Sequence, residues 1–333
     1  MFKKALVGIM ILSFCFGFLY ASSVEVQAED LHVGYVVNYM SHEWYQNIIA
    51  GAEERAEDLG VELTIADAEM DSSTQISAAE NLIAQGVDVL VLTPVDVDAL
   101  AGIVREAQNL NIPVISESNF LDGAETFVGI DNEGSGELAG DWLVEYSLEN
   151  DFEPRILVIG LPHQEDTRQR VSGFKTALEG SDIEYEIVQE VDGEGLREHA
   201  LARASDALTA NPDINVIYGI NDDSTTGGMS AYSEAGLDED ELVAIGFGLE
   251  GSVGQEALLG DTPYKTALAM FPNYVGASLI DASIMANEGE DLPDHYETPT
   301  LMITEDNFFD YYNEIEEGVY EIDFEALDEI MEK

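Results

Sequence analysis

The chain has 333 residues, of which 46% are hydrophobic, and it carries 68 Asp and Glu against 12 Lys and Arg, for a formal net charge of −56. The apolar fraction and a clear apolar periodicity indicate a folded protein and exclude a disordered acidic chain. Because phosphate contacts depend on clustered Lys and Arg, this charge balance disfavours nucleic acid as a partner.

Residues 1–28 are expected to be a signal peptide. Lys3 and Lys4 precede an apolar stretch at 5–20, and small residues follow, which is the order of a secretory signal. The stretch is shorter than the ~20 residues that span a bilayer, so we favour cleavage after Ala28 and a periplasmic or extracellular mature protein. A lipoprotein anchored through Cys15 and an uncleaved membrane anchor are the two alternatives.

The mature chain is expected to contain no cysteine, because Cys15 is the only one in the sequence. Disulfides, a thiolate nucleophile and Cys-bound zinc are thereby excluded. The formal charge after cleavage is −57, since residues 1–28 hold two Lys and one Glu. Such self-repulsion needs screening, and molar salt shortens the Debye length to ~3 Å, so we hypothesise a high-salt habitat.

Strand and helix patterns alternate along the mature chain. A strand at 31–40, a polar loop, a helix ended by Gly60 and a strand at 61–70 come first. Residues 75–86 then predict a helix with one apolar face, and the apolar run at 87–92 is typical of a strand buried on both faces of a parallel sheet.

A further helix and a strand at 113–118 complete a β-α-β unit. Ligands of open parallel sheets bind just beyond the carboxyl ends of the strands. Thr93, Pro94 and residues 116–119 are therefore expected to line one wall of a cleft.

The second half of the chain repeats this order. Strands are expected at 125–132, 155–163, 184–191, 214–220, 242–248 and 263–271, and a helix pattern follows each of them except 242–248. After another strand and a short acidic helix, residues 313–333 are expected to form a solvated amphipathic tail whose apolar side chains could dock on the body. About 305 mature residues exceed a single typical core, so an α/β fold with two doubly wound parallel-sheet domains is predicted.

The chain resembles the type I periplasmic sugar-binding proteins, closest in layout to the ribose-binding proteins of ABC transporters. The resemblance covers roughly residues 31–312 and is carried by stretches such as VGYVVNYMSHEWYQNIIAGAEERAEDLG, VDVLVLTPVDVDAL, VGIDNEGSGELAGDWL, TRQRVSGFKTAL, INVIYGINDDSTTGGMSAYSEAG and MFPNYVGA. It implies two Rossmann-like domains that close over a small molecule. The LacI-type repressors share these two domains. In the repressors a DNA-binding segment precedes the two domains, whereas in the present chain the expected signal peptide precedes them.

The resemblance also implies where the domains meet. Crossing segments are expected near 129–132, 270–272 and 298–300. The expected division is residues 29–131 plus 271–299 for the N-terminal lobe, 132–270 plus 300–312 for the C-terminal lobe, and 313–333 for the acidic tail.

Several binding positions of the family carry over. Trp44 and Tyr45 stand where the family sandwiches a sugar ring between aromatics, and Asn38 and His42 occupy neighbouring polar positions. A second group belongs to the facing lobe. Arg168 matches the arginine that forks onto ligand oxygens, and Asn221 matches the asparagine at a strand end.

Other family positions have changed. Ser118 and Asn119 replace an Asp-Arg pair, Gly248 replaces an aspartate, and Met270 replaces a glutamine. With these groups gone, the resemblance implies a ligand other than ribose, such as a deoxysugar, a polyol or a furanosyl signal molecule.

Structural roles are the alternatives for most of these residues. Trp44 and Tyr45 could be core aromatics, Arg168 could form an ion pair near the start of an acidic helix, and His42 and His163 could be surface residues. The acidic pair at 222–223 and the acidic run at 238–241 lack the ligand spacing of a calcium loop, and no metal or cofactor is expected.

The sequence therefore predicts a monomeric extracytoplasmic binding protein, not an enzyme. Its partners would be a saccharide or related small molecule and the membrane permease of an ABC transporter. A receptor that presents its closed form to a sensor kinase or chemoreceptor is the alternative. A secreted hydrolase is more distant, because the sequence has no Gly-x-Ser-x-Gly elbow, zinc signature or Cys/His pair.

Overall fold

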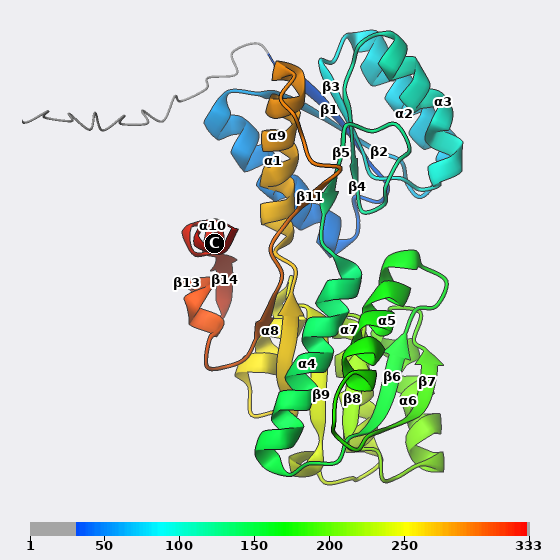
Figure 1. Ribbon diagram of the computed structural model, residues 1–333, viewed down its shortest axis with the longest axis vertical. Helices are drawn as coiled ribbons and strands as arrows, with labels where there is room; N and C mark the ends of the chain where they lie inside the picture. The colour runs from blue at the N-terminus through cyan, green and yellow to red at the C-terminus, as the bar shows by residue number, and fades with distance from the viewer. Residues whose placement is uncertain (1–30, 332–333) are drawn as a thin grey trace, which may run out of the picture.

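The computed structural model describes residues 31–331 and has two lobes, arranged one above the other along the long axis (Figure 1). The expected signal peptide, with Cys15 and the cleavage position after Ala28, lies outside the described residues. Each lobe contains a six-stranded sheet with helices on both faces. The predicted fold class, two doubly wound α/β lobes, is confirmed.

The N-terminal lobe is built on a parallel sheet with the strand order β11-β5-β4-β3-β1-β2. Helices α1 and α9 cover one face of this sheet, and α2 and α3 cover the other. All four residues of β3 are buried, as expected for a strand covered on both faces. The elements are β1 (His32–Val37), α1 (Glu43–Leu59), β2 (Glu62–Asp67), α2 (Ser72–Gln85), β3 (Val89–Leu92), α3 (Val97–Asn109), β4 (Val114–Glu117), β5 (Thr126–Gly129), α9 (Pro272–Glu288) and β11 (His295–Glu297).

The C-terminal lobe has the strand order β12-β10-β9-β8-β6-β7, in which the edge strand β12 is antiparallel and the other neighbours are parallel. Helices α4 and α5 pack on one face, and α6 and α7 pack on the other. The elements are α4 (Asn132–Asn150), β6 (Arg155–Gly160), α5 (Glu165–Glu179), β7 (Glu186–Asp192), α6 (Arg197–Ala210), β8 (Val216–Gly219), α7 (Asp222–Glu234), β9 (Val243–Gly248), α8 (Ser252–Leu259), β10 (Tyr264–Ala269) and β12 (Leu301–Ile303), with 3-10 turns at Glu239–Glu241 and Phe308–Asp310.

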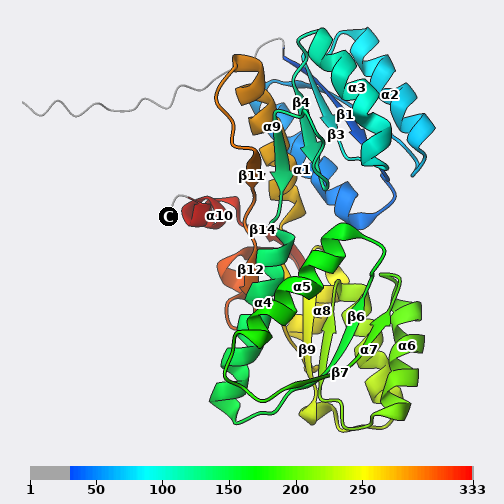
Figure 2. The same cartoon turned by 45° about the vertical axis from the view of Figure 1, so that its right-hand side comes forward.

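The chain passes between the two sheets at three places. It leaves the N-terminal sheet after β5 and enters α4, returns from β10 into α9, and crosses again between β11 and β12. Figure 2 shows these segments together at the junction of the lobes. Three neighbouring connections of this kind are typical of a hinge that lets two lobes close on a ligand.

Two glycines let α5 approach α4 closely. A Cβ atom at Gly173 would lie 1.9 Å from the backbone oxygen of Glu133, and one at Gly136 would lie 2.1 Å from the backbone oxygen of Arg170. Any larger residue would force the helices apart, because neither contact is with a flexible side chain. This contact fixes the rotation of α5 and hence the direction of the Arg170 side chain.

Three elements differ from the sequence expectations. Helix α1 begins at Glu43, within the stretch that was expected to be a polar loop before the helix. It begins there because the His42 side chain accepts a hydrogen bond from the backbone N–H of Trp44 and caps the helix. Helix α8 and strand β11 were not expected, since each is short and lacks a regular apolar pattern. Trp44 and Tyr45 therefore stand on the first turn of a helix and not in an irregular loop.

The C-terminal segment is folded instead of being a solvated tail. It forms a hairpin of β13 (Tyr312–Glu316) and β14 (Val319–Ile322) followed by α10 (Phe324–Met331), which lies beside the junction of the lobes in both views (Figures 1 and 2). Leu327 is fully buried, so the segment docks on the body through its apolar side chains as the sequence suggests. The hydroxyl of Tyr274 in α9 donates to the Asp328 carboxylate at 2.8 Å.

Within residues 31–331, none of the helices combines the length and apolar composition needed to cross a membrane.

Candidate ligand-binding site

A cavity of about 370 Å³ lies between the lobes and is lined by residues of both. The carboxyl ends of β1, β4, β6 and β8 point toward it, which is the usual place for ligands of parallel sheets. Seven residues singled out in the sequence line this cavity, namely Asn38, His42, Trp44, Tyr45, Ser118, Asn221 and Met270. Residues distant in the sequence are thus brought together as expected.

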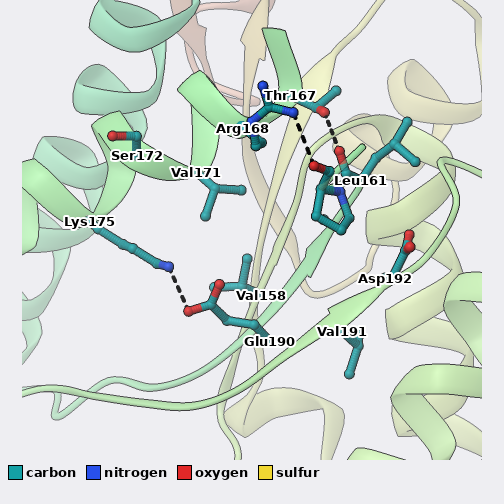
Figure 3. A pocket seen from close by; sticks show the side chains of 12 residues that line it. Val158, Leu161, Thr167, Arg168, Val171, Ser172, Lys175, Glu190, Val191 and Asp192 are labelled. Carbon is teal, nitrogen blue, oxygen red and sulfur yellow. Dashed lines mark hydrogen bonds and ion pairs between the residues drawn. The ribbon is translucent and has the colours of Figure 1, made fainter. Parts of the chain in front are cut away.

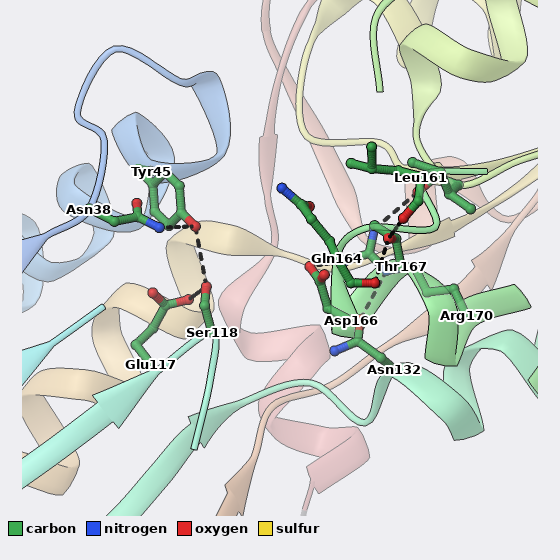
Figure 4. A network of polar contacts seen from close by, with 11 residues as sticks. Asn38, Tyr45, Glu117, Ser118, Asn132, Leu161, Gln164, Asp166, Thr167 and Arg170 are labelled. Carbon is green, nitrogen blue, oxygen red and sulfur yellow. Dashed lines mark hydrogen bonds and ion pairs between the residues drawn. The ribbon is translucent and has the colours of Figure 1, made fainter. Parts of the chain in front are cut away.

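The N-terminal wall is a chain of hydrogen bonds (Figure 4). The Asn38 amide donates to the Tyr45 hydroxyl at 2.9 Å, and that hydroxyl lies 3.5 Å from Ser118 Oγ. Ser118 Oγ donates to Glu117 Oε1 at 2.7 Å, and Thr93 Oγ1 donates to Glu117 Oε2 at 2.6 Å. These bonds fix the polar atoms of the wall before any ligand arrives.

Glu117 is the buried carboxyl group of this wall, and only 1% of it is exposed. Burial raises the pKa of its carboxyl to about 7, although the hydroxyls of Thr93 and Ser118 partly offset that rise. Burial and the nearby Glu117 raise the pKa of Tyr45 as well, so its hydroxyl remains a hydrogen-bond donor. The wall therefore offers a ligand a carboxyl group, a hydroxyl and an aromatic face.

Arg170 supplies the guanidinium of the facing wall. It is 8% exposed, donates through Nε to Asn132 Oδ1 at 2.9 Å and through Nη1 to the Ile220 backbone oxygen at 3.0 Å, and lies over the Phe247 ring at 4.4 Å. Asp166 lies 3.9 Å from Nη2. These contacts hold the planar group rigidly at the cavity, which favours recognition of ligand oxygens.

Arg168 does not line this cavity, which corrects the sequence expectation. Its side chain is 47% exposed, pairs with Glu165 and donates to the Pro162 backbone oxygen at 3.1 Å. Side chains two positions apart on an α-helix point in directions that differ by about 200°, so Arg168 and Arg170 cannot face the same side of α5. The ion-pair alternative considered for Arg168 is the one that the structure supports.

Arg168 instead borders a separate groove of about 530 Å³ formed by β6, α5 and β7 of the C-terminal lobe (Figure 3). Although this groove is larger, none of the residues that line it has a buried polar atom without a partner among the described residues. Lys175 Nζ in this groove lies 2.6 Å from Glu190 Oε1. The inter-lobe cavity leaves buried polar atoms without partners, and for that reason it is the better candidate site.

Two of those atoms are Asn38 Oδ1 and Glu250 Oε2, which lie on opposite lobes. Among the described residues neither has a hydrogen-bond partner. Leaving a buried acceptor unsatisfied costs roughly 1–3 kcal/mol. Asn38 and Glu250 both line the cavity, so these two unpaired acceptors lie in its opposite walls.

Glu250 lies against further acidic groups. Burial is the main cause that raises its pKa, and Asp222, Glu43 and Asp223 add to the rise while Arg170 opposes it. Asp222 is also buried with a raised pKa, but both of its oxygens are bonded, to the Tyr264 hydroxyl and to the Leu249 backbone N–H. The free acceptor of this cluster is therefore on Glu250.

The remaining predicted residues have structural positions. Thr93 is fully buried behind Glu117, and Asn119 lies next to Ser118 but does not line the cavity. Gly248 does not line it either. With φ of 125°, it gives room to Glu250, whose Oε2 would lie 2.2 Å from a Cβ at this position. Asn221 does line the cavity, but its amide is used to cap α7 and to bond the Gly195 backbone oxygen.

Sequence reasoning missed four charged groups that line the cavity, those of Asp166, Arg170, Glu194 and Glu250. Arg170 could have been found, because it shares four-residue spacing with Phe174 and Leu178 on the buried face of α5. Glu117 was not missed, because it ends β4 within the range 116–119 that was expected to line the cleft, and it lines the cavity. Glu250 follows two residues with positive φ, Gly248 and Leu249, and no pattern in the sequence indicates its direction.

Among the described residues, no group of three or more His, Cys, Asp or Glu side chains is arranged to hold a metal ion.

Known proteins share this arrangement. The ribose import binding protein of Bacillus subtilis (strain 168) is 28% identical over 257 residues, which cover 77% of the present chain and 81% of the relative. The D-xylose-binding periplasmic protein of Escherichia coli (strain K12) is 29% identical over 235 residues, or 68% of this chain and 70% of that protein.

The crystal structure of an ABC transporter solute-binding protein from Mycobacterium smegmatis, with bound glycerol, matches with a TM-score of 0.71 at 26% identity. The match covers 83% of the present chain and 95% of that one. A family model described as the periplasmic binding protein domain matches residues 33–291, and the resemblance seen in the sequence is confirmed. Because this match spans both lobes and the cavity between them, the chain belongs to the periplasmic binding protein family.

Proposed function

We propose that this protein is an extracytoplasmic solute-binding protein that captures a sugar or sugar-like molecule between its lobes. The observation that carries the proposal is the inter-lobe cavity, in which Trp44 and Tyr45 face the same space as Arg170 and Glu250. Saccharides present an apolar ring face and a rim of hydroxyls, so they suit a site that combines aromatic and charged groups. The relatives named for ribose and xylose binding support the same class of ligand.

In this proposal the ligand joins the lobes. Asn38, His42, Trp44, Tyr45, Ser118, Asn221 and Met270 are the proposed contact positions, together with Glu117, Arg170 and Glu250. Stacking adds about 0.5–1.5 kcal/mol per aromatic ring, and hydrogen bonds to charged groups add about 1.5–3 kcal/mol each. A few such contacts, made on both lobes, reach the roughly −8.2 kcal/mol of a micromolar complex and favour the closed arrangement.

The closed complex would deliver its ligand, as a monomer, to the permease of an ABC transporter. The similarity to the M. smegmatis solute-binding protein, which belongs to an ABC transporter, supports this role. Export by the signal peptide of residues 1–28 is part of the proposal, because such a protein works outside the cytoplasmic membrane.

A ligand screen tests the proposed function. Thermal unfolding is measured with pentoses, hexoses, deoxysugars, polyols, nucleosides and furanosyl compounds, and at least one saccharide class is expected to raise the unfolding temperature. Tryptophan fluorescence should change with the same compounds, because Trp44 lines the cavity and is one of two tryptophans. Trp44→Phe should remove that response, whereas Trp142, stacked on Tyr146 in the C-terminal lobe, serves as the unaffected control. Stabilisation by none of these classes would contradict the proposal.

We also propose that the protein works in concentrated salt. Its formal charge of −56 destabilises the compact state through self-repulsion, and molar salt screens charges beyond ~3 Å. The free energy of unfolding is therefore expected to rise between about 0.1 M and molar NaCl, the range over which the Debye length falls from ~10 Å to ~3 Å. Urea unfolding at several NaCl concentrations measures it, and a constant or falling stability would contradict the proposal.

A further inference from the structure

The charges that line the inter-lobe cavity are unbalanced. Four carboxyl groups face it, those of Glu117, Asp166, Glu194 and Glu250, whereas Arg170 is the one Lys or Arg among the lining residues. Arg170 is also largely committed to protein partners, since Nε and Nη1 bond to Asn132 and Ile220 and Nη2 lies near Asp166. The residues that line the cavity thus supply four carboxyl groups and a single guanidinium.

Two cavity-lining residues have a buried polar atom without a partner among the described residues, and both atoms are acceptors. Asn38 is 7% exposed and lines the cavity, and its amide nitrogen is used by Tyr45 while Oδ1 has no partner among the described residues. Glu250 Oε2 is the corresponding buried atom of the other lobe. Two acceptors on opposite walls are satisfied by a ligand that donates to both.

Glu250 is the group that distinguishes a cation from a neutral donor. The groups facing it are Glu43 of α1, Asp222 and Asp223 of α7, Arg170 of α5, and the neutral hydroxyl-bearing Tyr264 and Tyr312. Three of these groups are carboxyls and one is a cation, so an ionised Glu250 has insufficient positive charge around it. A ligand ammonium group beside Oε2 would supply that charge and donate to the unpaired atom.

Building on the proposed function, we propose that the cavity prefers a hydroxylated ligand that carries a protonated amine, such as an amino sugar or amino alditol, and that Glu250 receives its ammonium group. The aromatic faces of Trp44 and Tyr45 would hold the carbon skeleton, as for a neutral sugar. Asn38 Oδ1 would accept from a hydroxyl or from the same ammonium group.

Matched ligand pairs test this preference. D-glucamine is compared with D-sorbitol, and D-glucosamine with D-glucose, because the members of each pair differ by an amine in place of a hydroxyl. Isothermal titration at neutral pH is expected to give at least tenfold tighter binding for the amine of one pair. Glu250→Gln should remove the difference, whereas Glu165→Gln, on the exposed start of α5 outside the cavity, should preserve it.

The pH dependence provides a readout that does not need a variant. Burial and the neighbouring carboxyls raise the pKa of Glu250 to about 8, so below that pH the free protein holds a proton that an ammonium ligand must displace. The affinity for D-glucamine should fall as the pH is lowered from 8, by up to about tenfold per pH unit, because an alkyl amine like that of Lys stays charged throughout this range. A neutral ligand that accepts from protonated Glu250 would show no such loss.

The outcomes separate this inference from the proposed function. If D-sorbitol and D-glucose each bind as tightly as their amine counterparts, and Trp44→Ala abolishes that binding, the amine preference is overturned while the binding function stands. An amine preference that Glu250→Gln leaves intact overturns the assignment to Glu250. If no saccharide, polyol or amine binds, the proposed function itself is overturned.

Discussion

Arg170→Ala is expected to weaken binding of the ligand found in the screen by about 10- to 100-fold, whereas Arg168→Ala leaves binding unchanged. A hydrogen bond to a charged group contributes about 1.5–3 kcal/mol, and about 1.4 kcal/mol corresponds to tenfold in affinity. Arg170 lines the inter-lobe cavity, and Arg168 faces a separate groove. The two variants thus remove the same side chain from positions two residues apart on one helix.

Titration calorimetry of the two variants measures this difference directly. Arg170→Ala also leaves the Ile220 backbone oxygen and Asn132 without their donor, so its unfolding temperature is recorded without ligand. Arg170→Lys is the second variant, because it keeps a charge but loses the planar fork that contacts two partners at once. Loss of binding in Arg168→Ala with normal binding in Arg170→Ala would refute the placement of the site.

Leu327→Ala is expected to lower the free energy of unfolding by about 2–5 kcal/mol, the usual cost of removing a buried leucine side chain. Leu327 is fully buried in a cluster that contains Phe308 and Tyr312, so the truncation leaves a cavity between α10 and the C-terminal lobe. An effect of this size would make the C-terminal segment part of the folded body. Urea unfolding, followed by circular dichroism, provides the measurement.

The matched control for this prediction is Leu148→Ala. Leu148 lies near the end of α4 and is 68% exposed, so the same substitution there should change stability by no more than about 0.5 kcal/mol. Equal effects of the two substitutions would mean that α10 is not packed as described. A larger effect for Leu148→Ala would contradict the burial pattern of both helices.

Much of the fold follows from local patterns in the sequence. The run at 87–92 indicates a strand buried on both faces, and Gly60 and Gly86 adopt the positive φ that ends their helices. These signals depend only on neighbouring residues, so they can be recognised without tertiary information. Helix α8 and strand β11 were missed because each is too short to develop such a pattern, and packing alone stabilises them.

The candidate site is predicted less completely. The aromatic pair Trp44 and Tyr45 and the polar Asn38 and Ser118 do line the cavity, because they follow strands whose carboxyl ends meet there. The choice between Arg168 and Arg170 depends on the rotation of α5, which the glycine contacts with α4 fix. A motif that contains both arginines does not carry this information by itself.

The sequence by itself determined the two-lobed α/β fold and the position of a cleft between the lobes, because apolar periodicity, helix-ending glycines and strand ends are local properties. Only the tertiary structure decided which charges face that cleft. The Glu250 side chain lines the cleft and packs against Gly248. Gly248 also lies beside Asp222 of α7, whose carboxylate accepts a hydrogen bond from the Tyr264 hydroxyl of β10. The direction of such a side chain is set by packing between segments far apart in the chain, and that packing leaves no periodic trace in the sequence.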